Sequence, residues 1–573
     1  MRKTALLLLV LILGTLTIHA RAQRGTAVAP PADLVLTNGR IVTVDDRRPE
    51  AEAIAISKDR IQALGTADEI KSMIGPNTQV IDLQGKLAIP GFIESHGHFS
   101  GVGGSQLELN LMNVQSWDEI VKMVADAVTR AKPGQWIYGR GWHQEKWTSR
   151  PAPNVEGFPT HASLDKVSPD NPVALVHASG HAAFVNGKAM ELSGIRRPTE
   201  SPAGGEILRD QNSDATGLLR ETAQRLIKRG AGEPTPTDAE REARARQELE
   251  LAAKESLSKG ITTFEDAGSP LATIDLMKKM VDEGKLGIRL WVMVRQDNAA
   301  IADKLAQYRM IDYGDGHLTV RAIKKAIDGA LGPRGAWLLA PYGDKPESKG
   351  LQTTKTPDIE ETARLAMANG YQLAVHAIGD AANRETLDIF ERAFKANPGK
   401  KDLRWRVEHA QHLSAADIPR FGRMGVIASM QGIHCTSDAP YVIERLGRAR
   451  AQEGAYVWQK LMKSGAVVAN GTDAPVEDVD PIASYYATVS RKLKDGTVFY
   501  PDQRMSRMEA LKSYTINGAY AGFEEENRGS LEPGKYADIT VLSKDILKVP
   551  ENEIPTAKVV HTIVGGKVLY SSK

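Results

Sequence analysis

Cysteine is almost absent from this sequence, which has one, Cys435, among 573 residues. A single cysteine cannot form an intramolecular disulfide, so a disulfide-stabilised scaffold is excluded and stability depends on core packing, with bound metal as a further source. Aromatic residues are also few, at 6%, while hydrophobic residues make up 42% and charged residues 25%. This is the composition of an ordinary globular protein, and it excludes a disordered or collagen-like chain.

An excess of charge of either sign is missing too. Lys and Arg number 73 against 71 Asp and Glu, which gives a formal net charge of +2. Because nothing in this balance would steer the chain onto nucleic acid, we expect no nucleic-acid partner. The length excludes a single small core, since one core rarely grows past about 300 residues. The sequence leaves the oligomeric state open, a homo-oligomer included.

Long hydrophobic runs are missing except at the N-terminus, where Arg2 and Lys3 precede an uncharged, leucine-rich run over residues 5–18. A helix of about 14 residues rises about 21 Å, which is too short for a hydrocarbon core of about 30 Å. A small-x-small site follows at residues 20–22. Residues 1–22 are therefore predicted to be a cleaved signal peptide, which predicts an exported protein, periplasmic or secreted, with no membrane attachment after cleavage. An uncleaved N-terminal anchor is the alternative.

Short strand-like segments occur near both ends of the chain. Apolar and polar residues alternate over residues 33–90 as in half-buried strands, with a turn signal at Asn38-Gly39. Residues 537–570 show the same alternation. We expect a small β-sandwich domain built from both chain termini, residues 23–90 and 526–573.

The middle of the chain, residues 91–525, alternates apolar strand candidates with helical patterns. This rhythm predicts an α/β fold, a (β/α)8 TIM-type barrel. The stretch of about residues 100–235 is too long for a plain loop after barrel strand one, and it predicts an insertion over the barrel mouth. The eight strands are expected at Leu87–His98, Ile261–Asp266, Ile288–Val294, Leu318–Ile327, Gln372–His376, Arg404–His409, Val426–Met430 and Ala466–Asp473.

Ligand-type side chains stand at the ends of several predicted strands, where such barrels build their active sites. His96 and His98 are two residues apart on a strand, so their side chains point the same way and can share a metal ion. The fifth, sixth and eighth strands end at His376, His409 and Asp473. Each residue alone could be a hydrogen-bonded core residue, but together they favour a metal site.

Lys324 lies on the fourth predicted strand, on the face that it shares with the small residues Ala322 and Ala326. Burial there would lower its pKa and favour the neutral amine. A neutral amine can add carbon dioxide to become a carbamate, which offers two oxygens to bridge two cations. The alternative is a surface lysine next to Lys325, and a slip of one residue would exchange the two.

These residues, in this order, resemble the amidohydrolase superfamily, and the surrounding motifs resemble its family 3, the YtcJ-like branch, over essentially the whole mature chain. One departure is Glu94, which stands where the family usually has aspartate. The motifs are Pro90-Gly91-Phe92-Ile93-Glu94-Ser95-His96-Gly97-His98, Val375-His376-Ala377-Ile378-Gly379-Asp380, Arg406-Val407-Glu408-His409-Ala410-Gln411 and Gly471-Thr472-Asp473-Ala474-Pro475-Val476.

The resemblance implies a metal-dependent hydrolase with one or two divalent ions, zinc foremost, with manganese, iron or cobalt as alternatives. His96 and His98 would hold the more buried ion with Asp473 nearby, and His376 and His409 the second. Lys324, as its carbamate, would bridge the pair. Asp473 would act as general base on a metal-activated water that cleaves a non-peptide, amide-type carbon–nitrogen bond of a small molecule.

Further residues are candidates for contact with the substrate. Gln431 and His434, in a loop after strand seven, resemble substrate-pocket residues, and His181 of the insertion is expected to reach the substrate carbonyl as a catalytic residue. Trp142 and His143 belong to an aromatic cluster that could line a pocket. A solvated loop histidine and ordinary packing are the respective alternatives.

Two other functions compete with amide hydrolysis. One is a one-metal ring deaminase, which the presence of Lys324 and two further histidines disfavours. The other is a non-catalytic binding or regulatory protein on the same fold, which the complete ligand set disfavours.

Overall fold

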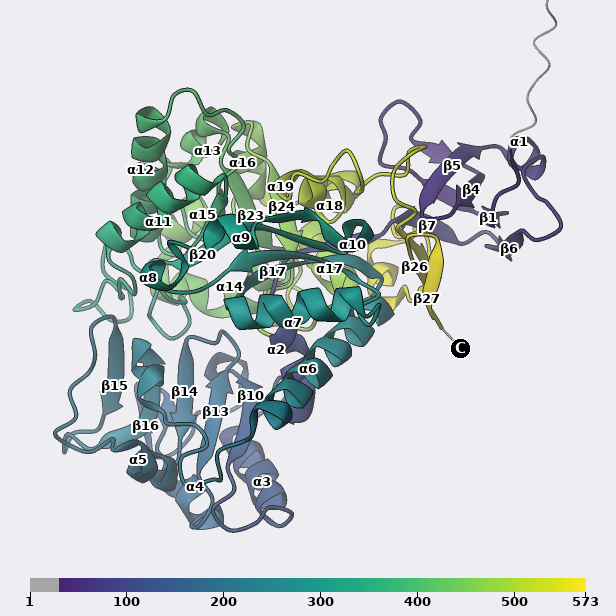
Figure 1. The fold of residues 1–573 in the computed structure, drawn as a ribbon. Helices are drawn as coiled ribbons and strands as arrows, with labels where there is room; N and C mark the ends of the chain where they lie inside the picture. Colours follow the sequence, from purple (N-terminus) through teal and green to yellow (C-terminus); the bar gives the residue numbers. More distant parts are fainter. Residues whose placement is uncertain (1–29, 573) are drawn as a thin grey trace, which may run out of the picture.

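The computed structural model describes residues 30–572, which form a barrel, a pair of sheets beside it and a separate sheet on another side (Figure 1). The predicted signal peptide lies outside the described residues. Within residues 30–572, no helix combines the length and the apolar composition that crossing a membrane requires.

Eight strands form the barrel, and each neighbouring pair along the sheet is parallel. The first and last strands meet through backbone hydrogen bonds, from Asp473 N to His96 O at 2.7 Å and from His98 N to Ala474 O at 2.7 Å. The predicted α/β barrel is therefore confirmed. In sheet order the strands are β8 (Phe92–Gly97), β17 (Ile261–Ser269), β18 (Arg289–Val294), β20 (Leu318–Ala326), β21 (Gln372–Ala377), β22 (Arg406–His409), β23 (Ile427–Gln431) and β24 (Val468–Gly471).

Helices follow the barrel strands along the chain and cover the barrel from outside (Figure 1). The longest, α6 (Asp238–Ser258), begins at a capping box in which Thr237 and Glu240 satisfy each other's backbone amides. The helix α13 (Ile418–Met424) has Pro419 in its first turn, where a missing amide hydrogen costs nothing. The others include α7 (Leu271–Asp282), α11 (Thr356–Asn369), α12 (Asp380–Ala396), α13 (Ile418–Met424), α14 (Gly432–Leu446) and α17 (Pro481–Ser490).

The single strand predicted over Leu87–His98 is wrong, because two strands share this segment. β7 (Leu87–Pro90) pairs with β25 (Ile539–Leu542) outside the barrel, and the barrel strand begins at Phe92. Gly91 lies between them, and a Cβ there would come within 2.1 Å of Thr262 Oγ1. Only glycine fits where the chain passes from one sheet to the other.

Two sheets pack beside the barrel; the first consists of N-terminal strands alone, and the second combines strands from both ends of the described chain. They share one hydrophobic core, in which Leu36 and Ile54 of the first sheet join Ile41, Ile539 and Val541 of the second. The first sheet has the order β5-β4-β1-β6 and the second β27-β26-β25-β7-β2-β3. Their remaining strands are β1 (Leu34–Thr37), β2 (Arg40–Val42), β3 (Glu50–Ala51), β4 (Ala53–Ser57), β5 (Arg60–Gly65), β6 (Gln79–Asp82), β26 (Val559–Val564) and β27 (Lys567–Ser571).

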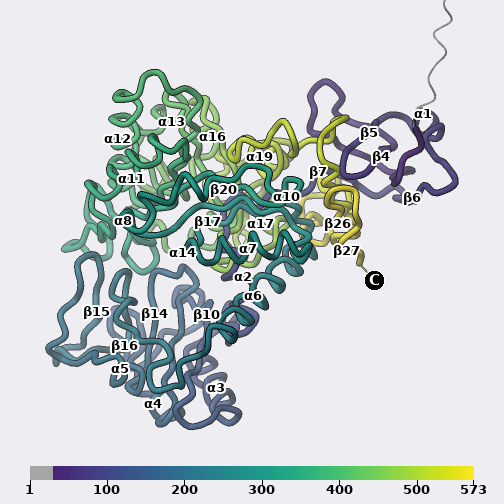
Figure 2. The backbone as a smooth tube through the Cα atoms, viewed as in Figure 1, coloured from purple at the N-terminus to yellow at the C-terminus, as the bar shows by residue number. Residues whose placement is uncertain are grey.

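A third body of structure lies between β8 and β17 in the sequence. Figure 2 shows its backbone as a unit beside the barrel, next to α2 (Phe99–Gly104) and α6. It has a hydrophobic core of its own, to which α3 (Trp117–Val128) contributes. Its six-stranded sheet has the order β15 (Gly205–Arg209), β16 (Ala215–Glu221), β14 (Ala182–Val185), β13 (Val173–His177), β10 (Ile137–Trp142) and β9 (Leu109–Asn110).

Candidate active site

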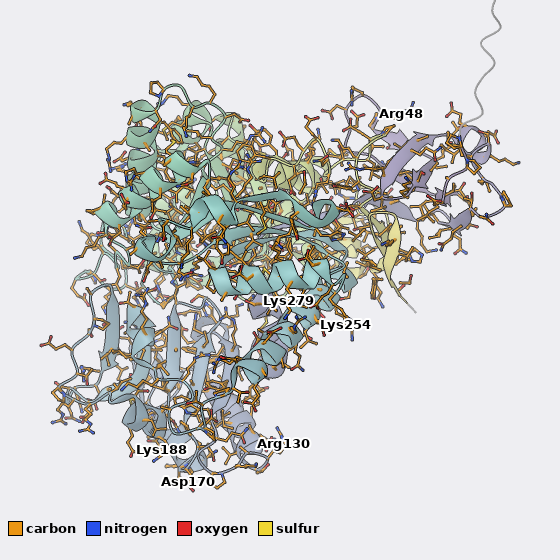
Figure 3. All side chains as sticks on the ribbon, in the orientation of Figure 1. Arg48, Arg130, Asp170, Lys188, Lys254 and Lys279 are labelled. Atoms are coloured by element: carbon orange, nitrogen blue, oxygen red, sulfur yellow. The ribbon has the colours of Figure 1, made fainter. Side chains whose placement is uncertain are left out.

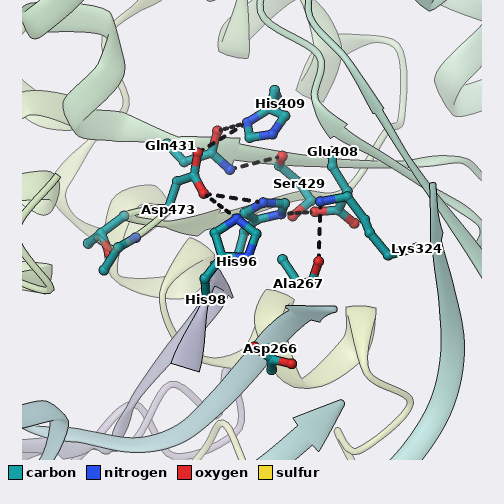
Figure 4. A network of polar contacts seen from close by, with 12 residues as sticks. His96, His98, Asp266, Ala267, Lys324, Glu408, His409, Ser429, Gln431 and Asp473 are labelled. Atoms are coloured by element: carbon teal, nitrogen blue, oxygen red, sulfur yellow. Dashed lines mark hydrogen bonds and ion pairs between the residues drawn. The ribbon is translucent and has the colours of Figure 1, made fainter. Parts of the chain in front are cut away.

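Asp473 lies at the centre of a group of histidines at the carboxyl ends of the barrel strands (Figure 4). Its carboxylate is 3.3 Å from Nε2 of His98, 3.5 Å from Nε2 of His96 and 4.0 Å from Nδ1 of His409. Burial alone would raise the pKa of Asp473, but the close approach of His98 and the electrostatic interactions with His96 and His409 lower it well below its ordinary value. Asp473 is therefore an anion at neutral pH.

The backbone at Asp473 is strained, with a φ of 58° in the left-handed region. Thr472, the preceding residue, is fixed because its amide donates to Oε1 of Glu94 at 2.7 Å and its hydroxyl to Oε2 at 2.9 Å. Strain of this kind persists only where the surroundings impose it, and it concentrates at functional sites. Glu94 thus holds the turn that presents Asp473.

His96 is fully buried and oriented from behind by Glu408, which binds its Nδ1 (Figure 4). Glu408 in turn accepts a hydrogen bond from Nε of Arg406 at 2.7 Å. Burial lowers the pKa of His96 to about 4, so the ring is neutral at pH 7. Its Nε2 has no hydrogen-bond partner and faces Asp473. A neutral imidazole with one nitrogen tied to a carboxylate is the form in which histidine binds metal.

His409 and His376 stand side by side, with ring centroids 4.4 Å apart. Nδ1 of His409 donates to Oε1 of Gln431 at 2.7 Å, an arrangement that leaves Nε2 with its lone pair. Nε2 of His376 is buried without a hydrogen-bond partner, 3.5 Å from Asp328. Burial holds the pKa of both rings well below the ordinary value, so both are neutral.

Lys324 projects toward the same group, and its side chain donates a hydrogen bond to the carbonyl oxygen of Ala267 at 3.4 Å (Figure 4). The side chain is buried, and burial together with the charge of Arg295 lowers its pKa to about 8. Lys325, the next residue, points the other way and donates to the carbonyl of Gln296 at 2.9 Å. The register therefore turns Lys324, and not Lys325, toward the histidines.

His181 reaches the barrel from the separate sheet, with its ring 4.8 Å from that of His376. Its Nδ1 donates to Oε2 of Glu221 at 2.7 Å. Burial would lower the pKa of His181, but the charge and hydrogen bond of Glu221 outweigh burial and raise it above the ordinary value. His181 can therefore be a cation beside neutral histidines.

The other predicted substrate residues have different surroundings. His434 is buried on α14 and its Nδ1 accepts from Gln411 at 3.0 Å, so the loop predicted after strand seven is a helix. His143 stacks on Tyr441, with ring centroids 5.5 Å apart. Trp142 does not reach the site, because it is wholly buried in the core of the separate sheet and donates to the carbonyl of Leu175.

Cys435, the single cysteine, is buried on α14, and burial raises the pKa of its thiol to about 11. A thiol of that pKa stays protonated, and it is not among the residues that line the cavities described below.

Two cavities meet at the histidines. The outer one has a volume of about 670 Å³ and lies between the barrel and the separate sheet, with His98 and Asp328 in its wall. The inner one holds only about 40 Å³ and is lined by His376, His409 and Asp473 among others. His181 borders both, which places it between a large chamber and a small one.

The residues present fit divalent metal. Buried ligand atoms without hydrogen-bond partners converge here, namely Nε2 of His96, Nε2 of His376 and Oδ1 of Asp473. Such atoms are costly unless something binds them. Two sets have ligand atoms within 4.8 Å of one another: His96, His98 and Asp473, and His409, His434 and Asp473. The second set contains His434, which the sequence predicted to line the substrate pocket. It does not contain His376, which the sequence predicted to bind the second ion.

Sequence reasoning assigned no role to several groups that hold the site together. Glu408 and Arg406 alternate on β22, a pattern that points two charged side chains into the barrel and could have drawn attention. Asp328 accepts backbone hydrogen bonds from Trp337, Ile378 and Gly379. Glu221 carried no local signal, because only the tertiary fold brings it to His181.

Comparison with known proteins identifies the family. The amidohydrolase family matches residues 79–570. The protein LONG AFTER FAR-RED 3 from Arabidopsis thaliana is 36% identical over 95% of this chain and 93% of its own length. The YtcJ protein of Bacillus subtilis is 31% identical over 93% of this chain and 98% of its own, and the N-substituted formamide deformylase of Arthrobacter pascens is 28% identical over 94% and 98%.

A solved structure agrees. An uncharacterized metal-dependent hydrolase from Pyrococcus furiosus superposes with a TM-score of 0.68 at 28% identity, covering 90% of this chain and all of that one. The predicted family is confirmed by these matches. The chain belongs to the amidohydrolase family and is a hydrolase of carbon–nitrogen bonds.

Proposed function

We propose that this protein hydrolyses a non-peptide, amide-type bond of a small molecule, with Asp473 as the general base. The observation that carries the proposal is the anionic carboxylate of Asp473, which His96, His98 and His409 surround at the meeting point of the two cavities. A general base must be ionised and within reach of the attacking water, and Asp473 meets the first condition through its lowered pKa.

We infer that His96, His98 and Asp473 hold one divalent ion, foremost zinc, and that His376 and His409 hold a second. Such an ion supplies Lewis-acid polarisation of the carbonyl and lowers the pKa of a bound water. Lys324 is suited to bridge the two positions as a carbamate, since a pKa of about 8 makes its neutral amine accessible near neutral pH.

Side chains of the protein itself transfer the proton and stabilise the carbonyl oxygen of the substrate. Asp473 takes the proton of the water and returns it to the leaving nitrogen. His181, charged through its contact with Glu221, faces the site from the opposite side and donates a hydrogen bond to the carbonyl oxygen of the substrate. Charge that develops on that oxygen is thereby stabilised by a preorganised donor.

The sizes of the cavities favour an amide with a small acyl group. A chamber of about 40 Å³ beside Asp473 accepts a formyl group or little more, whereas about 670 Å³ on the other side of His181 accepts a large nitrogen substituent. The relative named as an N-substituted formamide deformylase supports the same division.

The test is turnover and metal content of the purified protein. Loaded with Zn²⁺, Mn²⁺, Fe²⁺ or Co²⁺, it should release formate or another small carboxylate from a panel of N-substituted formamides and acetamides. Elemental analysis should give up to two ions per chain. Release of ammonia from ring amines with one ion per chain would instead indicate a deaminase.

Three further properties complete the proposal. We infer that residues 1–22 are a signal peptide and that the enzyme acts in the periplasm or outside the cell. Residues 23–90 and 526–573 would form a β-sandwich domain, and residues 91–525 the catalytic barrel with its insertion. Mass spectrometry of the exported protein would reveal the cleavage site, and a chain that still began at Met1 would overturn the first point.

A further inference from the structure

The outer cavity is lined by four arginines, which the proposed chemistry does not use. Arg140 comes from β10, Arg225 and Arg229 from the segment after β16, and Arg295 from the residue that follows β18. The cavity is therefore basic on both sides, the barrel side and the side of the separate sheet.

Arg295 acts electrostatically on two of the proposed ligand residues. Its positive charge contributes to lowering the pKa of both His98 and Lys324. Within residues 30–572, its guanidinium makes neither an ion pair nor a hydrogen bond. Asp266 and Asp473 add favourable charges near Arg295, but neither forms an ion pair with it, so its guanidinium faces the cavity unpaired among the described residues.

Arg140 faces the same space and has only neutral partners. Its Nε donates to the carbonyl of Pro475 at 3.3 Å and its Nη2 to that of Ala178 at 3.2 Å. These contacts hold the guanidinium at the boundary between barrel and insertion without neutralising it. Preorganised arginines of this kind suit planar anions, which they can bind with two hydrogen bonds.

Two buried arginines, Arg220 and Arg289, behave differently. Arg220 contacts Glu156 and Glu206, Arg289 contacts Asp538, and carboxylates raise the pKa of both arginines in spite of burial. For Arg140 and Arg295 desolvation prevails and the pKa is lowered. Their charges are therefore compensated less than those of Arg220 and Arg289.

The carboxylates of the cavity wall are mostly engaged elsewhere. Glu221 accepts from His181, Glu248 from Arg244 at 3.0 Å, and Asp328 from three backbone amides. Glu108 adds a favourable charge near Arg140 but forms no ion pair with it. The cavity thus retains unpaired positive charge beside His98.

We propose that the nitrogen substituent of the substrate carries an anionic group, a carboxylate or a phosphate, which Arg295 and Arg140 bind in the outer cavity. The inference rests on the proposed hydrolysis and specifies its substrate class. The small acyl group would occupy the inner chamber, and the anion would fix the position of the amide between His181 and Asp473.

The first experiment compares three N-formyl compounds of matched shape: N-formylphenylalanine, its phosphonate analogue and its neutral amide. Formate release by the metal-loaded enzyme should be about 10- to 100-fold more efficient in kcat/KM for an anionic compound, mainly through KM, as one charged hydrogen-bonded contact implies. Whichever anion is favoured identifies the group. A neutral amide that is hydrolysed equally well or better would overturn the proposal.

Variants then assign the preference to the arginines. Arg295→Gln should remove most of the difference between anionic and neutral compounds, and Arg295→Lys should retain part of it. Arg130→Gln is the matched control, because Arg130 is exposed just after α3, on the side of that body away from the barrel (Figure 3). An equal loss on all three compounds in Arg295→Gln would mean a structural role and overturn the assignment.

A binding measurement separates failure of this inference from failure of the proposed function. Calorimetry with the Asp473→Asn protein should show N-formylphenylalanine bound at least about ten-fold more tightly than its amide, with the difference lost in the Asp473→Asn/Arg295→Gln double variant. If no amide is hydrolysed, the hydrolase proposal fails but this preference still decides the anion site. Equal binding of both compounds would overturn the anion site whatever the turnover.

Discussion

Two buried polar clusters occupy opposite ends of the barrel, and they differ in how completely they are satisfied. At the start of β18, Arg289 binds both oxygens of Asp538, at 2.8 and 3.2 Å, and donates to the carbonyl of Asp315 at 2.8 Å. Asp538 also accepts from the amide of Gly565 at 2.8 Å. At the other end, His96, His376 and Asp473 each keep a buried atom without a hydrogen-bond partner.

The difference separates a structural network from a functional one. The cluster around Arg289 connects the barrel to the terminal sheets, and the charge of Arg289 is paired with that of Asp538. The cluster around Asp473 leaves the groups that a metal and a substrate need, at a cost in stability that the rest of the fold offsets. Substitutions in the Asp473 cluster should therefore reduce turnover with little effect on stability, and substitutions in the Arg289 cluster should do the reverse.

The largest effect on turnover is expected from Asp473→Asn. The amide keeps the size of the side chain but cannot take a proton, so kcat should fall about 10²- to 10⁴-fold. Elemental analysis should still find most of the metal, and Tm should change little. Asp170→Asn, at an exposed position (Figure 3), is the control. A fully active Asp473→Asn enzyme would refute the assignment.

Asp538→Asn should reduce stability and leave turnover unchanged. Loss of the carboxylate leaves the buried charge of Arg289 without its partner, which typically costs about 3–5 kcal/mol in the free energy of unfolding. Urea titration measures this cost. Metal content and kcat of the folded fraction should match the wild type, and a loss of metal would mean that the two clusters are not separate.

Glu408→Gln tests whether the site depends on the carboxylate behind His96. The variant removes the negative charge that orients the ring, so metal affinity should fall about 10- to 100-fold. Competition with a chelator gives the affinity. Unchanged affinity would show that packing alone holds His96 in place.

Metal should stabilise the wild-type protein by mass action, by about 2.7 kcal/mol at an ion concentration 100 times the dissociation constant. Thermal unfolding with and without added Zn²⁺ measures the gain. Asp538→Asn should keep this gain although its baseline is lower. Equal Tm values with and without metal in the wild type would contradict the proposed binding.

The smallest expected effect is on the pH dependence of stability in acid. Burial would raise the pKa of Asp538, but the charge and hydrogen bonds of Arg289 lower it. A lowered folded pKa stabilises the protein above the unfolded value of about 4, and this contribution is lost as pH falls through the folded pKa. The stability difference between wild type and Asp538→Asn should therefore shrink between pH 5 and pH 3 (about one unit either side of the unfolded value). A difference independent of pH would exclude this origin.

Much of the fold could be predicted because the barrel strands carry their own signals. β18 and β21 are buried along their whole length and have apolar centres, as strands covered on both faces do, and the intervening helices have their own periodicity. Boundaries that depend on tertiary contacts could not be predicted. The division at Gly91 follows from pairing with β25, more than 400 residues away.

The site shows the same limit. Residues at strand ends could be proposed one by one, since a barrel brings such ends together. Glu221 and the arginines of the outer cavity could not, because they belong to a sheet whose placement on the barrel no local pattern encodes. Trp142 shows the same limit, because an aromatic cluster has the same sequence pattern whether it lines a pocket or packs in a core.

The pairing of β7 with β25 also bears on synthesis. A ribosome that has released β7 and β8 must add more than 400 further residues before β25 emerges. Until then one edge of β7 lacks its neighbour, and the first barrel strand starts from an unfinished support. The nascent chain therefore carries an open strand edge through most of translation, an interval in which it is exposed to wrong pairing and would benefit from a chaperone.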